Sequence, residues 1–291
     1  MSKILWLASY PKSGNTWLRA FLLNLLHNPS TPFDINKMSG FSPVDSDAVW
    51  YGRIDPRSPK DLSDADLARL RPKVHALIAE MAPDTALVKT HNAHVEVDGT
   101  PMITQSLTAG AIYVVRNPLD VALSYAHHVD RPVEEIITEM ANAGHNTSAR
   151  ETNVPEHRCD WSTHVESWTG RPHPATHVVR YEDMSRRPGP TFRAIARFLG
   201  LKPPRERIDR AIRHASFRAL RAQEDRSGFI ESSSRQQRFF RAGKVDGWRQ
   251  VLTDAQVRRV VERHRVQMER FGYVPVGLRA ARAASDHTGS P

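Results

Sequence analysis

A short polar turn between an apolar strand and an apolar helix constrains this chain more than any other feature. Residues 5–19 read Leu-Trp-Leu-Ala-Ser-Tyr-Pro-Lys-Ser-Gly-Asn-Thr-Trp-Leu-Arg, and the turn occupies Pro11–Thr16. The pattern predicts a helix over Trp17–Leu26, whose free N–H groups and positive dipole end would point at the turn. A strand, a turn and a helix arranged in this way are typical of a phosphate-binding loop.

The side chains of the turn are those that a bound phosphate requires. Gly14 permits close approach of the backbone, and Ser13 and Thr16 offer hydroxyl groups. Lys12 supplies a positive charge, but it precedes the glycine instead of following it. The turn therefore departs from the usual nucleotide-binding pattern, in which a glycine opens the loop and the lysine follows the last glycine.

Composition limits the class of protein. With 291 residues and 40% hydrophobic content, the chain can bury a core in one large domain. A net charge of +9 favours acidic partners such as phosphate-bearing ligands. The single cysteine, Cys159, excludes an internal disulfide and indicates a reducing compartment. We see no signal peptide and no apolar run long enough to span a membrane, so we expect a cytoplasmic protein without membrane insertion.

Four apolar runs alternate with helical patterns, which predicts an α/β fold: a single three-layer domain of the P-loop type, with a central parallel sheet flanked by helices. The predicted strands are Ile4–Ala8, Ala86–Lys89, Ala111–Val115 and His177–Arg180. Besides Trp17–Leu26, the predicted helices are Lys73–Met81, Leu119–Val129, Thr191–Leu199, which ends at Gly200, and a helix from the capping box at Thr253 to Phe271.

Three stretches carry little pattern, at about 28–60, 141–160 and 221–238. Loops of this length inside a domain are often binding loops. We expect the domain to span 1–276 and the Ala-, Arg- and Ser-rich tail, 277–291, to be disordered.

Charged side chains follow the second and third strands. Lys89 and His91 stand at the end of the second strand, and Arg116 follows the third. Because the carboxyl ends of parallel strands meet at one edge of the sheet, we expect these groups near the phosphate-binding turn. A single histidine among 14 is weak evidence taken alone, and His94 invites a metal site only if a third ligand lies nearby, which the sequence does not supply.

The string Pro-Lys-Ser-Gly-Asn-Thr-Trp resembles the phosphosulfate-binding loop of the cytosolic-type sulfotransferases, which use 3′-phosphoadenosine 5′-phosphosulfate (PAPS). Four further motifs follow in the family's order, over residues 5–249. The resemblance implies a site for PAPS and transfer of its sulfuryl group to a hydroxyl or amine, leaving adenosine 3′,5′-bisphosphate (PAP). It implies His91 as the catalytic base, Lys12 as the cation at the leaving phosphate and Lys89 as a second cation beside the transferring group.

The cofactor-binding residues that the resemblance implies fall into four groups. The loop itself contributes Lys12, Ser13, Gly14, Asn15 and Thr16. The motif Arg-Asn-Pro-x-Asp followed by a helical Ser-Tyr gives Arg116 and Ser124 at the 3′-phosphate, with Asp120 as a cap or as an organiser of the arginine loop. The adenine would lie near Trp17, Tyr181 and Phe217, and the C-terminal Phe-Arg-Ala-Gly-Lys-x-x-Gly-Trp would close over the 3′-phosphate through Arg241 and Gly243.

Two departures from the family pattern stand out. Ala215 occupies a position where many members carry a hydroxyl, and Ala242 replaces a basic residue, for which Lys244 could substitute. A third departure lies outside the cofactor motifs: the family's dimerisation stretch is not kept, so we do not expect dimerisation by that route, and the oligomeric state stays open.

Two other functions share some of these features. A P-loop kinase would need a carboxylate to hold magnesium after a strand, where this chain has Lys89 or Arg116. A basic nucleic-acid-binding protein would need a recognisable module, and none is seen. We therefore expect a sulfotransferase that needs no metal and acts on a small-molecule acceptor, not on nucleic acid. The class of acceptor stays open among phenols, sugars, lipids, amines and natural-product scaffolds.

Overall fold

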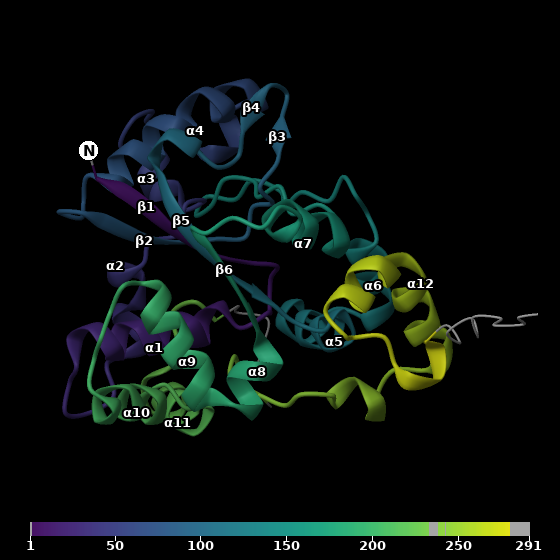
Figure 1. The fold of residues 1–291 in the computed structure, drawn as a ribbon. Coiled ribbons are helices and arrows are strands. Elements are labelled where there is room, and N and C mark those ends of the chain that lie inside the picture. Colours follow the sequence, from purple (N-terminus) through teal and green to yellow (C-terminus); the bar gives the residue numbers. More distant parts are fainter. Residues whose placement is uncertain (1, 233–237, 242, 280–291) are drawn as a thin grey trace, which may run out of the picture.

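The computed structural model describes residues 2–232, 238–241 and 243–279. Its centre is a sheet of parallel strands in the order β2-β1-β5-β6 (Figure 1). These strands are β1 (Lys3–Ser9), β2 (Thr85–Thr90), β5 (Thr108–Val115) and β6 (Thr176–Arg180). The predicted parallel sheet is confirmed, and each observed strand contains its predicted range.

Helices cover both faces of this sheet (Figure 1). They are α1 (Asn15–His27), α2 (Met38–Phe41), α3 (Ala48–Tyr51), α4 (Asp64–Ala79), α5 (Pro118–Val129), α6 (Val133–Met140), α7 (Trp161–Thr169), α8 (Tyr181–Arg186), α9 (Pro188–Phe198), α10 (Arg205–His214), α11 (Phe217–Ser227) and α12 (Asp254–Arg270). Short 3-10 helices lie at Ile35–Lys37, Pro59–Asp61, Gln105–Leu107, Gly247–Gln250 and Val276–Leu278, and β3 (Glu96–Val97) pairs with β4 (Thr100–Pro101) in a separate hairpin.

The first strand is buried on both sides, and its alternating side chains divide the core into two layers. Ile4 and Trp6 pack into a cluster with residues of α4, α7 and α12. Leu5 and Leu7 pack into the other cluster, with residues of α1, α9 and α10. A continuous apolar run is what a strand covered by helices on both faces requires. The layers place the carboxyl end of β1 in the middle of the molecule.

Helix α1 begins at Asn15, two residues before its predicted start. Gly14 stands immediately before it with a φ of +109°, a conformation that favours glycine. A Cβ built at Gly14 would lie 2.6 Å from the ring of Tyr181, so a side chain has no room there. Two of the residues predicted for the cofactor site are therefore in close contact.

The helix predicted over Lys73–Met81 is longer than expected, since α4 begins at Asp64. A capping box starts it: the Ser63 hydroxyl accepts from the Asp66 N–H at 3.1 Å, and the Asp66 carboxylate accepts from the Ser63 N–H at 3.2 Å. The helix continues through Pro72. The prediction began too late because proline inside a helix is normally unfavourable.

The stretches with little pattern differ in outcome. Residues 28–60 form short helical turns, and 141–160 are held by isolated bridges. We expected an irregular loop over 221–238. This is wrong for residues 221–227, because α11, which begins after the Ser216 cap, continues to Ser227. Residues 233–237 lie outside the described residues. The sequence analysis also did not predict α2, α3, α6, α7, α8 or α10.

Of the tail predicted to be disordered, only residues 277–279 are described. Gly277 and Leu278 belong to the 3-10 helix that follows α12, Arg279 caps it, and the Leu278 carbonyl accepts a hydrogen bond from Arg265. Residues 280–291 lie outside the described residues. Within the described residues, no helix is long and apolar enough to cross a membrane.

Candidate active site

The loop after β1 takes a conformation that leads its backbone directly into the start of α1. Lys12 and Gly14 both have positive φ, +63° and +109°, and the Ser13 N–H bonds back to the Tyr10 carbonyl at 3.3 Å. The first N–H groups of α1 have no partner within the helix, as at any helix start. They follow Gly14 directly, so the loop and the helix N-terminus form one anion-binding surface.

Asn15 fixes this loop to the strand that precedes it. Its side-chain amide donates to the Leu7 carbonyl at 2.7 Å and to Ser9 Oγ at 3.3 Å. Asn15 is buried, and these bonds hold the start of α1 against the end of β1. The side-chain amide of Asn15 thus holds the loop against β1. The group of Asn15 that can donate to a bound anion is its backbone N–H.

Arg116, at the end of β5, joins three parts of the predicted site. Its guanidinium donates to the Lys12 carbonyl at 2.9 Å and to the Lys244 carbonyl at 3.2 Å. It also stacks 4.1 Å from the centre of the Tyr181 ring. One side chain therefore connects the phosphate-binding loop, the C-terminal motif and the start of α8.

Several polar atoms in this region are buried and have no hydrogen-bond partner among the described residues. Ser13 Oγ, Trp17 Nε1 and Arg116 Nε can donate a proton, whereas Asn15 Oδ1 can only accept one. Buried polar groups are normally paired, so such atoms at one place indicate a missing partner. The three donors fit an acceptor-rich anion such as a phosphosulfate.

The C-terminal motif is positioned by α5. The Asp120 carboxylate accepts from the backbone N–H groups of Asp246 and Trp248, at 2.8 and 3.0 Å. Asp120 was predicted as a cap or an organiser of the arginine loop, and the structure shows it holding the C-terminal turn instead. Gly243, with a φ of +60°, lies against Phe217: a Cβ there would be 2.4 Å from the ring. Two predicted residues that are far apart in the chain thus meet.

The C-terminal segment also reaches Lys12. Its ammonium lies 3.9 Å from the centre of the Phe239 ring. The N–H groups of Phe239 and Phe240 donate to the two carboxylate oxygens of Glu224 in α11, at 2.6 and 2.9 Å. Burial, together with the positive charges of Arg116 and Lys89, lowers the pKa of Lys12 to about 7.

His91 stands just past the end of β2, beside the end of β1. Its Nδ1 lies 2.7 Å from the Ser9 carbonyl oxygen, and a carbonyl oxygen can only accept. Nδ1 therefore carries the proton, and Nε2 keeps its lone pair. Burial, with the positive charge of Lys89 nearby, lowers the pKa of His91 to about 3, so the ring is neutral near pH 7. This is the tautomer and charge that a general base needs.

Lys89 takes part in an ion triad. Its ammonium lies 3.3 Å from a carboxylate oxygen of Glu231, and the guanidinium of Arg19 lies 2.8 Å from the same carboxylate. Burial would raise the pKa of Glu231, but the charges of Lys89 and Arg19 outweigh it and hold that pKa at about 2. Glu231 is therefore ionised at neutral pH.

The side chains of three predicted residues make no hydrogen bond or ion pair with the part of the chain that the structure describes. Thr16 lies in the first turn of α1, Ser124 lies two turns into α5, and both are partly exposed. Arg241 is exposed near the end of α5, where its charge adds to burial in lowering the pKa of His127. Their roles stay predictions.

The sequence analysis missed several residues around the site. Arg19 and Glu231 were not singled out, although a charged residue within the apolar run of α1 is a signal of a buried partner. His164 was also missed: its ring nitrogens lie 2.8 Å from the Tyr113 hydroxyl and 3.2 Å from the His91 carbonyl. Its contact with the His91 carbonyl helps to hold the backbone of His91 in place.

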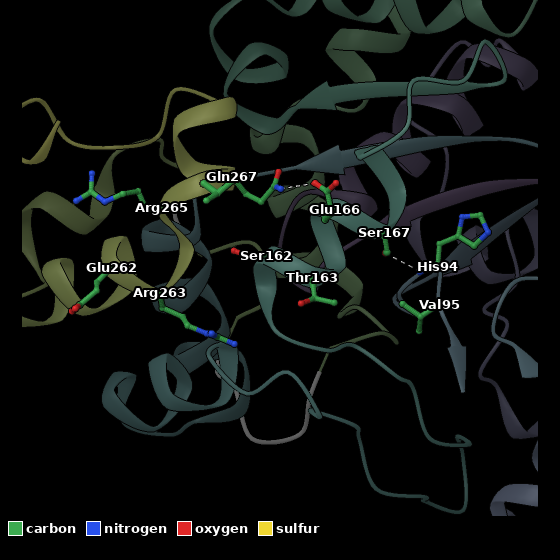
Figure 2. Close-up of a pocket in the computed structure, with 11 residues that line it drawn as sticks. His94, Val95, Ser162, Thr163, Glu166, Ser167, Glu262, Arg263, Arg265 and Gln267 are labelled. Atoms are coloured by element: carbon green, nitrogen blue, oxygen red, sulfur yellow. Dashed lines mark hydrogen bonds between the residues drawn. The ribbon is translucent and has the colours of Figure 1, made fainter. Parts of the chain in front are cut away.

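A surface cavity of about 570 Å³ lies apart from these residues, between α7 and α12 (Figure 2). His94 lies at one end of it and tilts against Trp168 at 5.0 Å between ring centres. The cavity contains none of the residues predicted to bind the cofactor. Among the described residues, no group of three or more His, Cys, Asp or Glu side chains could hold a metal ion.

Comparison with known proteins identifies the family. The model of the sulfotransferase domain matches residues 2–272. The chain is 25% identical to sulfotransferase 1A1 of the dog (Canis lupus familiaris) over 226 residues, 75% of this chain and 65% of the dog protein, so it spans just under two thirds of that relative. It is 25% identical to cytosolic sulfotransferase 5 of Arabidopsis thaliana over 256 residues, 84% of this chain and 73% of the plant protein.

Two solved structures share the fold of this chain. The chain resembles a retinol dehydratase, solved with androsterone and the inactive cofactor PAP, with a TM-score of 0.62 and 21% identity, over 91% of this chain and 80% of the other. It resembles a mouse sulfotransferase complexed with PAP, with a TM-score of 0.60 and 20% identity, over 94% and 90%. The fold is thus shared, and because the family model matches nearly the whole sequence, the chain belongs to the sulfotransferase domain family.

Proposed function

We propose that this sulfotransferase transfers the sulfuryl group of PAPS to a hydroxyl or amine of a small-molecule acceptor, with His91 as the general base. Membership of the family supports the reaction and the enzyme class. PAP in two structures of the same fold supports PAPS as the cosubstrate. The observation that carries the proposal is the 2.7 Å contact between His91 Nδ1 and the Ser9 carbonyl oxygen, from which we infer that Nδ1 holds the proton and Nε2 is free to accept one.

His91 removes the proton of the acceptor. Its Nδ1–H is held by the Ser9 carbonyl, so Nε2 is the atom that receives the proton when the acceptor attacks. The short bond to Ser9 also fixes the plane of the ring. Since Ser9 ends the strand that leads into the loop, the base and the anion site are held at a fixed separation.

Positive groups of the chain stabilise the charge that develops on the leaving phosphate. PAPS supplies the sulfuryl group, and Lys12, Lys89 and the start of α1 surround the place where its phosphosulfate fits. Lys12 gains a close partner there, because among the described residues its ammonium lies over the Phe239 ring, is repelled by Arg116 and Lys89, and has Glu224 as a weaker attracting charge. Preorganised charges of this kind are a large part of catalysis in group transfer.

The remaining predicted residues divide between the two ends of the nucleotide. Arg116, Ser124, Arg241 and the backbone of Gly243 serve the 3′-phosphate. Trp17 and Phe217 enclose the adenine with aromatic surface, which gives affinity without reading the base. Tyr181 is buried against Gly14 and Arg116, and we assign it a supporting role beneath the loop.

The acceptor lies beside His91 and the irregular stretches, and its chemical class is open. The motifs agree with a protein that acts on a small molecule in the cytoplasm. The cytoplasmic location and the absence of a nucleic-acid substrate stay predictions. The curated relatives include a flavonol 3-sulfotransferase of Flaveria bidentis, 24% identical over 275 residues. Phenols of that kind are a rational first set of acceptors.

The test is transfer of label from ³⁵S-PAPS to a panel of phenols, sugars, amines and lipids. We expect at least one labelled product with the wild type and loss of that product with His91→Ala. His173→Ala is the matched control, because His173 is exposed and lies before β6, at the amino edge of the sheet. Labelled product from His91→Ala at the wild-type rate would overturn the assignment of the base.

A further inference from the structure

We propose that Glu231 is a positioning residue for the reaction: its carboxylate holds the ammonium of Lys89 beside the phosphate-binding loop. The inference rests on the proposed role of Lys89 as the second cation at the transferring group. It concerns the segment just before the C-terminal motif, which no motif of the sequence analysis includes. The Arg19–Glu231–Lys89 ion triad carries it.

Lys89 needs a partner to have one position. Its backbone is fixed, since its N–H donates to the Pro43 carbonyl at 2.9 Å and its carbonyl accepts from Asp45 at 3.2 Å. Its side chain, however, is a flexible stem that ends in a point charge. Glu231 lies 3.3 Å from that charge. The carboxylate thus decides where the ammonium lies.

Arg19 anchors the carboxylate from the other side. It is fully buried, and its guanidinium donates to the hydroxyl and the carbonyl of Ser42, at 2.6 and 3.0 Å, as well as to Glu231 at 2.8 Å. These bonds leave Arg19 little freedom to move, so its guanidinium fixes the position of the Glu231 carboxylate. It belongs to α1, and Glu231 is therefore tied to the helix whose N-terminus binds the anion.

The backbone around Glu231 is held as well. Asn36 accepts a hydrogen bond from the Ile230 N–H at 2.9 Å and donates to the Gly228 carbonyl at 3.2 Å. Phe229 is buried in the same core cluster as Leu5 and Leu7. The residues on the amino side of Glu231 are thus docked on the body of the protein, and the carboxylate is preorganised.

This arrangement links two parts of the enzyme. Glu231 precedes the C-terminal motif that is predicted to close over the 3′-phosphate, and it contacts the cation predicted to act at the sulfuryl group. The packing of the segment around Glu231 against the rest of the protein therefore positions Lys89.

The first variant is Glu231→Gln, which keeps the shape and removes the charge. We expect kcat to fall about tenfold or more with little change in KM for PAPS, because a charge-assisted bond to Lys89 is lost. Glu231→Asp, which retains the charge, should recover part of the loss. Glu151→Gln is the matched control: it breaks an exposed ion pair with Lys60 and should leave kcat unchanged. A kcat within about twofold of wild type for Glu231→Gln overturns the proposal.

The second test separates positioning from simple neutralisation of Arg19. A buried arginine without its partner is costly, so Glu231→Gln alone could lower the folded fraction. The double variant Arg19→Gln/Glu231→Gln removes both charges, and circular dichroism gives its melting temperature. We expect this protein to fold and still to have a low kcat. Recovery of wild-type kcat in the double variant would show that Glu231 only neutralises Arg19, which overturns the proposal.

The third test places the effect at Lys89. Lys89→Met should lower kcat, and adding Glu231→Gln in that background should cause no further loss, since the residue to be positioned is gone. An equal further loss overturns the positioning role. A wild-type kcat for Lys89→Met would instead contradict the proposed function of Lys89, so the two failures are distinguishable.

Discussion

Arg116 donates to the carbonyl oxygen of Lys12 at 2.9 Å, and this bond joins the two motifs that are predicted to hold the two phosphate groups of PAP. The loop lies at the end of β1 and Arg116 at the end of β5, which are neighbouring strands. The same guanidinium reaches the carbonyl of Lys244. Both predicted anion sites therefore depend on one side chain.

Arg116→Ala should weaken PAP binding about 100-fold, because it removes a phosphate ligand and loosens both the loop and the C-terminal motif. Isothermal titration calorimetry measures the change. Arg187→Ala is the matched control. It removes the same charge from an exposed arginine that pairs with Asp183. Equal weakening by both variants would mean that only net charge matters.

PAP binding should take up a proton at pH 8 through Lys12. In the free protein the pKa of Lys12 is about 7, so at pH 8 its amine is mostly neutral. A bound phosphate favours the charged form and raises this pKa, so affinity increases as the pH falls towards 7 and levels off below it. At pH 8 the phosphate groups are already ionised, with a second pKa near 6, and do not contribute.

Calorimetry in buffers of different ionisation enthalpy should give an uptake of between about 0.5 and 1 proton for the wild type. The variant Lys12→Arg keeps the positive charge and cannot lose its proton, so it should bind PAP without proton uptake. A wild type that binds PAP at pH 8 with no uptake would contradict the lowered pKa.

The ring of His91 should stay neutral from pH 8 to pH 5 in the protein without nucleotide. Burial and Lys89 lower its pKa to about 3, whereas an unperturbed histidine gains a proton near pH 6.5. In an NMR titration, the ring resonance that disappears in His91→Ala should not move over this range. A full shift between pH 7 and pH 5 would refute the prediction.

Gly243→Ala should weaken PAP binding far more than Gly99→Ala. Both glycines have positive φ, +60° and +75°, so both variants carry a similar backbone strain of about 1 kcal/mol. A Cβ at Gly243 would lie 2.4 Å from the Phe217 ring, but at Gly99 it would meet nothing within 4 Å. Because only the Gly243 variant displaces Phe217, the difference in PAP affinity between the two variants, measured by calorimetry, reports that displacement. Equal affinities of the two variants for PAP would mean that Gly243 and Phe217 are not part of the site.

The sheet and the residues at its carboxyl edge could be predicted because the signals are local. Apolar runs mark buried strands, and Lys12, His91 and Arg116 each follow such a run directly. Parallel strands then bring the three to one edge whatever the rest of the chain does.

The ion triad could not be predicted in this way. Arg19 and Glu231 are 212 positions apart, and Glu231 lies in a stretch with little pattern. Their contact depends on how α1, β2 and the segment after α11 pack together. The sequence showed only that a charge interrupts the apolar face of α1. The same reason explains why Asp120 was associated with the arginine loop and not with Asp246 and Trp248.

The central claim is a site built for PAPS, and the most direct test is a comparison of nucleotides by calorimetry and thermal melting. PAP should bind tightly and raise the melting temperature, since a ligand that binds only the folded state stabilises it by mass action. AMP and ATP with magnesium, which lack the 3′-phosphate, should bind much more weakly. ATP with magnesium binding as tightly as PAP would contradict the account and favour a kinase.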